Sequence, residues 1–145
     1  MQLSQHFSLE EAVISQTAAR KGIDNTPSPE VEANMVESAQ RMEEVRDLLD
    51  APILVSSWFR CPKLNSAIGS TASSAHVRGW AIDFTAPLFG TPQDVCRKIQ
   101  GSGLTWDQLI FEGTWTHISF DPKQRMQVIT AHFVGGKTTY TQGVS

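Results

Sequence analysis

Helical signals gather in the first half of the chain and strand signals in the second half, and this order limits the fold more than any other feature. After Pro29, apolar side chains recur at three- to four-residue multiples, which predicts a helix of about twenty residues with one buried face. Shorter apolar runs then predict strands. Helices first and strands later indicate an α+β fold, with N-terminal helices packed on a small, mostly antiparallel sheet. The helix stripe consists of Val31, Met35, Met42, Val45 and Leu49, and the strands are expected at 53–59, 80–84, 109–112, 115–120 and 126–133.

Capping residues indicate where the helices begin and end. Ser8 and Glu11 form a capping box that predicts a helix over residues 9–20, and Gly22 suits its left-handed end. Ser28 is the expected N-cap of the long helix, because proline is tolerated in a first turn. Further helices are predicted at 62–68 and from residue 91 to residue 101 or 103, whereas the Gly/Thr-rich tail, 135–145, is expected to be loose at its end.

Composition excludes several classes of protein. The chain has 145 residues, the size of one domain, and its net charge of −3 makes nucleic acid a poor partner. No apolar run approaches the ~20 residues that span a bilayer. Residues 1–6 lack the features of a secretory signal, so we expect a protein made in the cytoplasm without a signal peptide. Two cysteines are too few for a disulfide framework, and we expect a monomer with reduced thiols, Cys61 and Cys96.

Three residues stand out as a candidate metal site. His76 and Asp83 lie on a segment that runs from a polar loop into a predicted strand, and His117 lies on the second arm of a predicted hairpin. Two histidines and one carboxylate suit a catalytic zinc that keeps water as its fourth ligand. Spacing alone leaves the alternative open that these are ordinary hydrogen-bonded polar residues.

The predicted hairpin places a carboxylate near this site. If residues 113–114 form a two-residue loop, Glu112 faces Trp115 and Ile110 faces His117. Glu112 is then the diagonal neighbour of His117, at roughly 5–8 Å. A carboxylate so placed can take a proton from a metal-bound water that attacks an amide. An exposed carboxylate at a strand end remains the alternative.

The motifs around these residues resemble peptidase family M15, the zinc D-Ala-D-Ala carboxypeptidase family. Its relatives include VanX-type dipeptidases and phage L-alanyl-D-glutamate endolysins, and the chain looks most like the small single-domain branch, subfamily A. The resemblance covers about residues 6–121 and suggests a hedgehog/DD-peptidase-like fold, with residues 1–145 as one zinc peptidase domain. It rests on Ser74-x-His76-x-x-Gly79-x-Ala81-x-Asp83, on Trp115-x-His117, and on residues 57–65, where Trp58 replaces the usual glycine.

The resemblance implies roles for individual residues. His76, Asp83 and His117 would hold one catalytic Zn²⁺, and Ser74 would support His76 and fix the orientation of its ring. Arg60 would bind a substrate carbonyl or carboxylate, although a structural ion pair is an alternative. We also expect the substrate groove to be lined by Trp115.

The catalytic acid is where the sequence departs from several branches of the family. They carry an acidic residue three positions before the last histidine, where this chain has Thr114, or a histidine two positions before it, where this chain has Trp115. The nearest upstream carboxylate is Glu112, and the small branch carries its acid there. We therefore predict Glu112 as the general base, with Asp107 as the second candidate.

The predicted function is a zinc-dependent peptidase that hydrolyses peptidoglycan stem peptides, at either D-Ala-D-Ala or L-Ala-D-Glu. A phage endolysin, or a virion part that digests the cell wall, would explain a wall enzyme without a signal peptide. Two alternatives stay open. One is a non-catalytic, zinc-containing module that binds cell walls or builds a virion, and the other is a soluble D-Ala-D-Ala dipeptidase.

Overall fold

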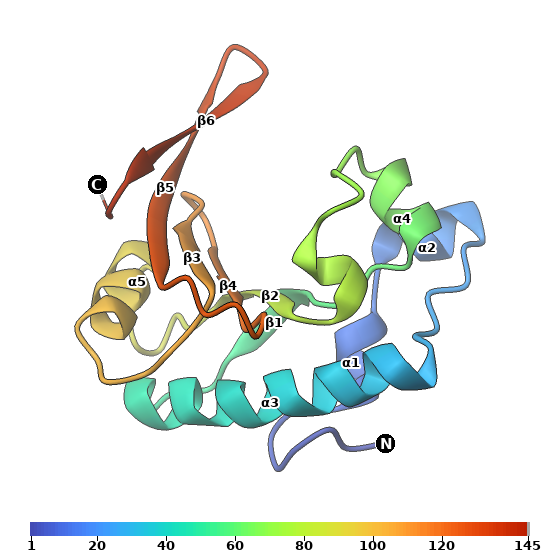
Figure 1. Cartoon of the computed structure of the whole chain (residues 1–145), viewed down its shortest axis with the longest axis horizontal. Coiled ribbons are helices and arrows are strands. Elements are labelled where there is room, and N and C mark those ends of the chain that lie inside the picture. The colour runs from blue at the N-terminus through green and yellow to red at the C-terminus, as the bar shows by residue number, and fades with distance from the viewer. Residues whose placement is uncertain (145) are drawn as a thin grey trace.

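Residues 1–144 are described by a computed structural model; three N-terminal helices come first, and a six-stranded sheet follows, with shorter helices between its first strands (Figure 1). The strand order is β1-β2-β4-β3-β5-β6, and every neighbouring pair is antiparallel except β3 and β5. The predicted α+β class with a mostly antiparallel sheet is confirmed. The helices are α1 Leu9–Val13, α2 Gln16–Lys21, α3 Pro29–Leu49, α4 Pro62–Ala67, the 3₁₀ helix η1 Ala75–Arg78 and α5 Pro92–Gln100. The strands are β1 Leu54–Ser57, β2 Ala81–Thr85, β3 Gln108–Phe111, β4 Thr116–Ser119, β5 Gln127–Val134 and β6 Lys137–Gln142.

The long helix α3 forms as its sequence predicts. The Ser28 hydroxyl accepts a hydrogen bond from the backbone N–H of Val31 at 3.3 Å and so caps the first turn. Of the predicted stripe, Val31 is only half-buried. The other members lie in the main core, which places the apolar face of α3 against the sheet; they are Met35, Met42, Val45 and Leu49.

The predicted helix over residues 9–20 is wrong in its middle, because the chain breaks there into α1 and α2. Ile14 has extended backbone and is 67% exposed, so no buried stripe holds a helix together across this point. The Ser15 hydroxyl accepts from the N–H of Ala18 at 3.1 Å and starts a new helix. The capping box at Ser8 and the left-handed end at Gly22 are both confirmed.

The C-terminal tail contains a strand that the sequence analysis did not predict. Residues 137–142 form β6, which pairs with β5 through a turn at Gly135 and Gly136. Both glycines have positive φ, the conformation that tight hairpin turns require. Ser145, at the end of the tail expected to be loose, lies outside the described residues.

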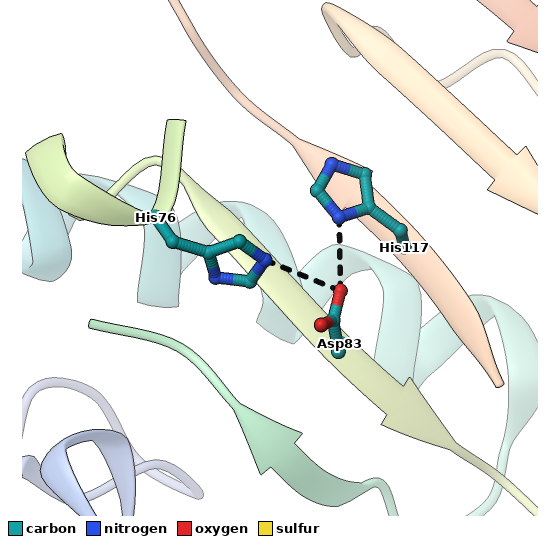
Figure 2. A group of neighbouring side chains, drawn as sticks. All are labelled: His76, Asp83 and His117. Carbon is teal, nitrogen blue, oxygen red and sulfur yellow. Dashed lines mark hydrogen bonds and ion pairs between the residues drawn. The ribbon is translucent and has the colours of Figure 1, made fainter. Parts of the chain in front are cut away.

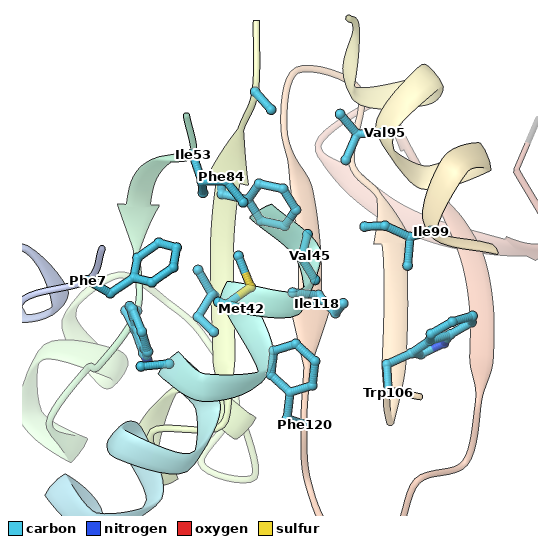
Figure 3. Packing of buried hydrophobic residues seen from close by; sticks show 14 of the residues in the cluster. Phe7, Met42, Val45, Ile53, Phe84, Val95, Ile99, Trp106, Ile118 and Phe120 are labelled. Carbon is cyan, nitrogen blue, oxygen red and sulfur yellow. The ribbon is translucent and has the colours of Figure 1, made fainter. Parts of the chain in front are cut away.

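The sheet has one buried face and one open face. On the buried face, residues of β2, β3 and β4 pack against α3 and α5 in the main hydrophobic core (Figure 3). The other face carries Asp83 on β2 and His117 on β4, and η1 brings His76 close to them. No helix within residues 1–144 combines the length and the apolar character needed to cross a membrane.

Candidate active site

Pairing between two neighbouring strands sets the centre of the site. Asp83 on β2 lies directly opposite His117 on β4, and Asp83 Oδ1 is 2.9 Å from His117 Nδ1. His76 reaches the same oxygen from η1, with its Nε2 3.3 Å away (Figure 2). One nitrogen or oxygen atom of each residue lies within 4.8 Å of those of the other two. The structure thus brings the three predicted ligands together in a group that could hold a metal ion.

A backbone carbonyl fixes the ring of His76. His76 Nδ1 lies 2.6 Å from the carbonyl oxygen of Trp58, and a carbonyl can only accept, so Nδ1 carries the proton. The Nε2 lone pair therefore faces Asp83, as a metal ligand requires. Ser74 was expected to orient this ring, but its hydroxyl instead accepts from the backbone N–H of His76, at 3.3 Å. Sequence reasoning missed the contribution of the Trp58 carbonyl.

A glycine connects the first two residues of the group and ties them to the core. Gly79 has a φ of +80°, and a Cβ atom there would lie 2.6 Å from Cγ of Met35 on α3. Its carbonyl accepts hydrogen bonds from the Ser38 hydroxyl at 3.0 Å and the Trp58 indole at 3.2 Å. The tight turn between His76 and Asp83 is thereby anchored on α3, and only glycine fits it without strain.

Electrostatics favour the protonation states that metal ligands need. Burial lowers the pKa of His76, and the charge and hydrogen bond of Asp83 offset only part of this effect. Burial alone would raise the pKa of Asp83, but the neighbouring histidines, His76 and His117, outweigh it and hold that pKa well below its usual value. Near neutral pH, His76 is therefore a neutral ligand for a metal ion, and Asp83 is an anionic one.

Arg60 lies beside the group as the sequence motif predicts. Its guanidinium contacts Asp83 Oδ2 at 3.4 Å and donates to the Ser57 hydroxyl at 3.2 Å. Its backbone N–H donates to the carbonyl of His76 at 3.2 Å. Burial lowers the pKa of Arg60, and the charges of Asp83 and Glu112 raise it in part, but an arginine stays charged at neutral pH.

The predicted hairpin register is confirmed, and it brings Glu112 to the site. Ile110 pairs with His117, and the backbone N–H of Glu112 donates to the carbonyl of Trp115 at 3.1 Å. Burial raises the pKa of Glu112; the nearby charge of Asp83 also raises it, while His117 and Arg60 lower it in part. The result is a carboxylate that holds a proton more readily than an exposed glutamate does.

Asp107, the second candidate base, is already paired with Arg125. Its two carboxylate oxygens accept from Nε and a terminal nitrogen of Arg125, each at 2.9 Å, and Oδ1 also accepts from the Arg125 backbone N–H at 3.0 Å. The side-chain hydrogen bonds of Arg125 are the largest effect on Asp107, and they lower its pKa. A carboxylate held in this way is a poor proton acceptor.

These residues line one cleft with a volume of about 830 Å³. One wall is the loop of residues 68–75, and the opposite wall is the hairpin of β5 and β6 at the far edge of the sheet; Figure 1 shows the two on opposite sides of β2. Trp115 lines the cleft, as expected, with its ring centroid 6.2 Å from that of Phe133. All the predicted site residues line it, namely Arg60, Ser74, His76, Asp83, Asp107, Glu112, Trp115 and His117.

Sequence reasoning missed two groups that line the same cleft. Phe133 and Tyr140 come from the hairpin of β5 and β6, and counting along paired strands would have indicated them had β6 been predicted. The second group is basic and comes from two separate segments, the end of η1 and the loop between β4 and β5, for which no sequence signal exists. Its members are Arg78, Lys123 and Arg125.

Comparison with known families gives one match. The model of the family described as Peptidase M15 matches residues 5–119, a segment that contains the His-Asp-His group, Arg60 and Glu112 but ends before β5. No curated protein matches the chain. The family match confirms the resemblance found in the motifs. Since the matched segment covers more than half of the 145 residues, the chain belongs to the peptidase M15 family.

Proposed function

We propose that the protein is a zinc-dependent peptidase that hydrolyses the stem peptides of peptidoglycan, as a phage endolysin or a related wall enzyme would. Membership of the M15 family makes it a peptidase, and peptidases of this family depend on zinc. The observation that carries the proposal is the His76–Asp83–His117 group, with Glu112 beside it in one cleft. A peptide substrate fits a cleft of this size, which is open between two walls.

The residues present fit a zinc ion. Two imidazole nitrogens and one carboxylate oxygen form the donor set of many catalytic zinc sites, which leave a further position for water. His76 Nε2, His117 Nδ1 and a carboxylate oxygen of Asp83 would be the ligand atoms. When bound, zinc lowers the pKa of a coordinated water to about 7 and polarises a carbonyl oxygen.

Glu112 is the proposed general base and then the general acid. Its raised pKa suits a group that takes a proton from the attacking water and later gives it to the leaving amine. Asp107 is not proposed for this role, because Arg125 already occupies both of its oxygens.

Arg60 and Trp115 are the proposed substrate-binding residues near the reacting bond. The Arg60 guanidinium can donate to a carbonyl or carboxylate oxygen of the substrate while it contacts Asp83. The Trp115 ring lines the cleft, where it would pack against a bound peptide.

Incubation of the purified protein with isolated cell walls tests this function. We expect new amino termini to appear, to stop with a chelator and to return with zinc. Mass spectrometry of the fragments identifies the bond. A fall in wall turbidity separates an endopeptidase that cuts within the stem peptides from a carboxypeptidase that trims chain ends. Zinc-loaded protein that binds walls without cleaving them would establish the non-catalytic module instead. Cleavage of free D-Ala-D-Ala but not of walls would establish a dipeptidase.

A further inference from the structure

We propose that Arg78, Lys123 and Arg125 form a subsite that binds a carboxylate of the substrate, a few residues away from the bond that is cleaved. This inference rests on the proposed function, because it concerns how the same cleft binds an acidic peptide. All three side chains line the cleft that contains the His-Asp-His group.

The position of the subsite follows from the strand register. Along β3 and β4, Glu112 and Trp115 lie between the Ile110–His117 pair and the turn at residues 113–114. Gln108 and Ser119, which pair with each other, lie on the opposite side of it and also line the cleft. The basic residues gather at this second end, beyond Ser119, so the two ends of the cleft lie on opposite sides of the proposed metal site.

Buried acidic residues hold two of the basic side chains in place. Asp121 is 7% exposed and contacts a terminal nitrogen of Arg78 at 3.1 Å. Asp107 is 2% exposed and binds Arg125 through two side-chain hydrogen bonds. Both arginine side chains nevertheless remain 52% exposed. Each guanidinium has five N–H donors, more than its aspartate uses, so it can also bind a ligand.

The third cation gives this end of the cleft a net positive charge. Lys123 follows Asp121 in the same turn, and its backbone N–H donates to Asp121 Oδ1 at 3.0 Å. Three basic side chains thus face two carboxylates at this end, whereas the opposite end carries the carboxylate of Glu112 and the aromatic residues Trp115, Phe133 and Tyr140. An acidic group of a bound peptide would be attracted to the basic end and repelled by Glu112.

The distance from the metal group suits a peptide that spans several residues. Asp121 lies four positions after His117, two of them beyond the end of β4, so at about 3.3 Å per extended residue the separation is at most about 13 Å. An extended peptide covers that length with three to four residues. In a stem peptide, both the α-carboxylate of D-Glu and the carboxylate of the last D-Ala are candidates for this position.

Amidated peptides test the subsite, because a carboxamide has nearly the shape of a carboxylate but no charge. The probes are L-Ala-γ-D-Glu-L-Lys-D-Ala-D-Ala and two analogues, one amidated on D-Glu and one at the C-terminus. Binding is measured calorimetrically to zinc-free protein, so that a result is obtained even if no bond is cleaved. We expect one of the two amidations to raise Kd about tenfold, as the loss of a charge-assisted contact does.

Variants of the basic residues test whether they cause the rise in Kd on amidation. Lys123→Gln should reduce the ratio between the amidated and acidic Kd values at least twofold, and Arg78→Gln should do the same. Arg97→Gln, on α5 and outside the residues that line the cleft, is the matched control and should leave the ratio unchanged. Near-ultraviolet circular dichroism checks that each variant is folded.

Two outcomes would overturn the subsite. Wild-type protein that binds the acidic peptide and both amides equally well would show that no carboxylate is bound. Variants that weaken all three peptides equally would show that the basic residues act without regard to the carboxylate. An absence of hydrolysis with a normal Kd ratio would instead contradict only the proposed function.

Discussion

Two neighbouring rows of residues cross the same four strands, and only one of them carries ionisable side chains. One row, on the face packed against α3 and α5, is entirely apolar; three of its members belong to the main core, and the fourth packs against that core. The other row, one residue further along β2 and one back along β4, carries two of the proposed zinc ligands. The core row is Ile82, Ile118, Leu109 and Val128. The other row, called the cleft row for its first two members, is Asp83 and His117 followed by Ile110 and Ile129, which are buried in a second, smaller hydrophobic cluster.

This comparison shows how the fold separates stability from chemistry. Successive side chains of a strand point to opposite faces, so adjacent residues such as His117 and Ile118 serve different purposes. The core row stabilises the sheet by burial, while the cleft row places ionisable groups at fixed distances. Substitutions in the core row should therefore lower the free energy of unfolding, and those near the cleft row should change catalysis or metal binding.

The largest effect is expected on the cleft face, from Glu112→Gln. Loss of the general base should lower kcat by about 10²- to 10⁴-fold, because the amide cannot accept the proton from water. The free energy of unfolding should change by less than about 1 kcal/mol, as for most substitutions outside the core. Steady-state hydrolysis and urea unfolding measure the two quantities. A variant with wild-type kcat would remove Glu112 from the mechanism.

Ile118→Ala tests the core face at a position adjacent to a proposed ligand. Ile118 is 1% exposed in the main core, so its truncation should lower the free energy of unfolding by about 2–5 kcal/mol. His117→Ala, compared in zinc-free protein, should cost less, because it removes no part of that core. Urea denaturation of both variants gives the order. A greater loss in His117→Ala would contradict the division between the two faces.

The pKa of Glu112 tests whether the side chains at the cleft act on one another through their charges. Burial keeps its pKa above the ordinary value of 4.5 in zinc-free protein, and the positive charge of Arg60 lowers it in part, so Arg60→Gln should raise it further. A base must be ionised to act, and kcat should therefore fall as the pH drops through this pKa. Carboxyl NMR of zinc-free wild type and Arg60→Gln measures the shift. A pKa at or below 4.5 would contradict the burial of Glu112.

The smallest effect concerns the two thiols. Cys96 is fully buried in the core, and burial raises its pKa to about 11, whereas Cys61 is partly exposed as the N-cap of α4. Only a thiolate reacts readily, so one thiol should react with Ellman's reagent in native protein at pH 8 and two in denaturant. Cys96→Ser should leave the native count unchanged. Rapid reaction of Cys96 in folded protein would mean that α5 does not seal the core face.

Signals that act over a few residues were sufficient to predict much of this fold. Caps and an apolar stripe located α3, and the two-residue loop expected at residues 113–114 was enough to predict that Glu112 lies beside His117. The M15-like spacing then selected the residues that lie together in the cleft. These features depend on local backbone geometry, which the sequence expresses directly.

Features that depend on contacts between distant segments were not predicted. The carbonyl of Trp58 that holds His76 carries no mark in the sequence, because every residue has a carbonyl. Arg78 and Arg125 meet at one end of the cleft only after the sheet has formed. The break at Ser15 shows a local limit as well, since a serine can either continue a helix or cap a new one.

The zinc content of purified protein tests the central claim most directly. After incubation with zinc and removal of the excess, elemental analysis should find about one zinc ion per chain in wild type and in Glu112→Gln, since Glu112 is not a proposed ligand. His76→Ala and His117→Ala, each folded by circular dichroism, should retain far less. Wild-type protein without bound zinc, or a histidine variant that keeps a full equivalent, would contradict the assignment of His76, Asp83 and His117 as the metal site.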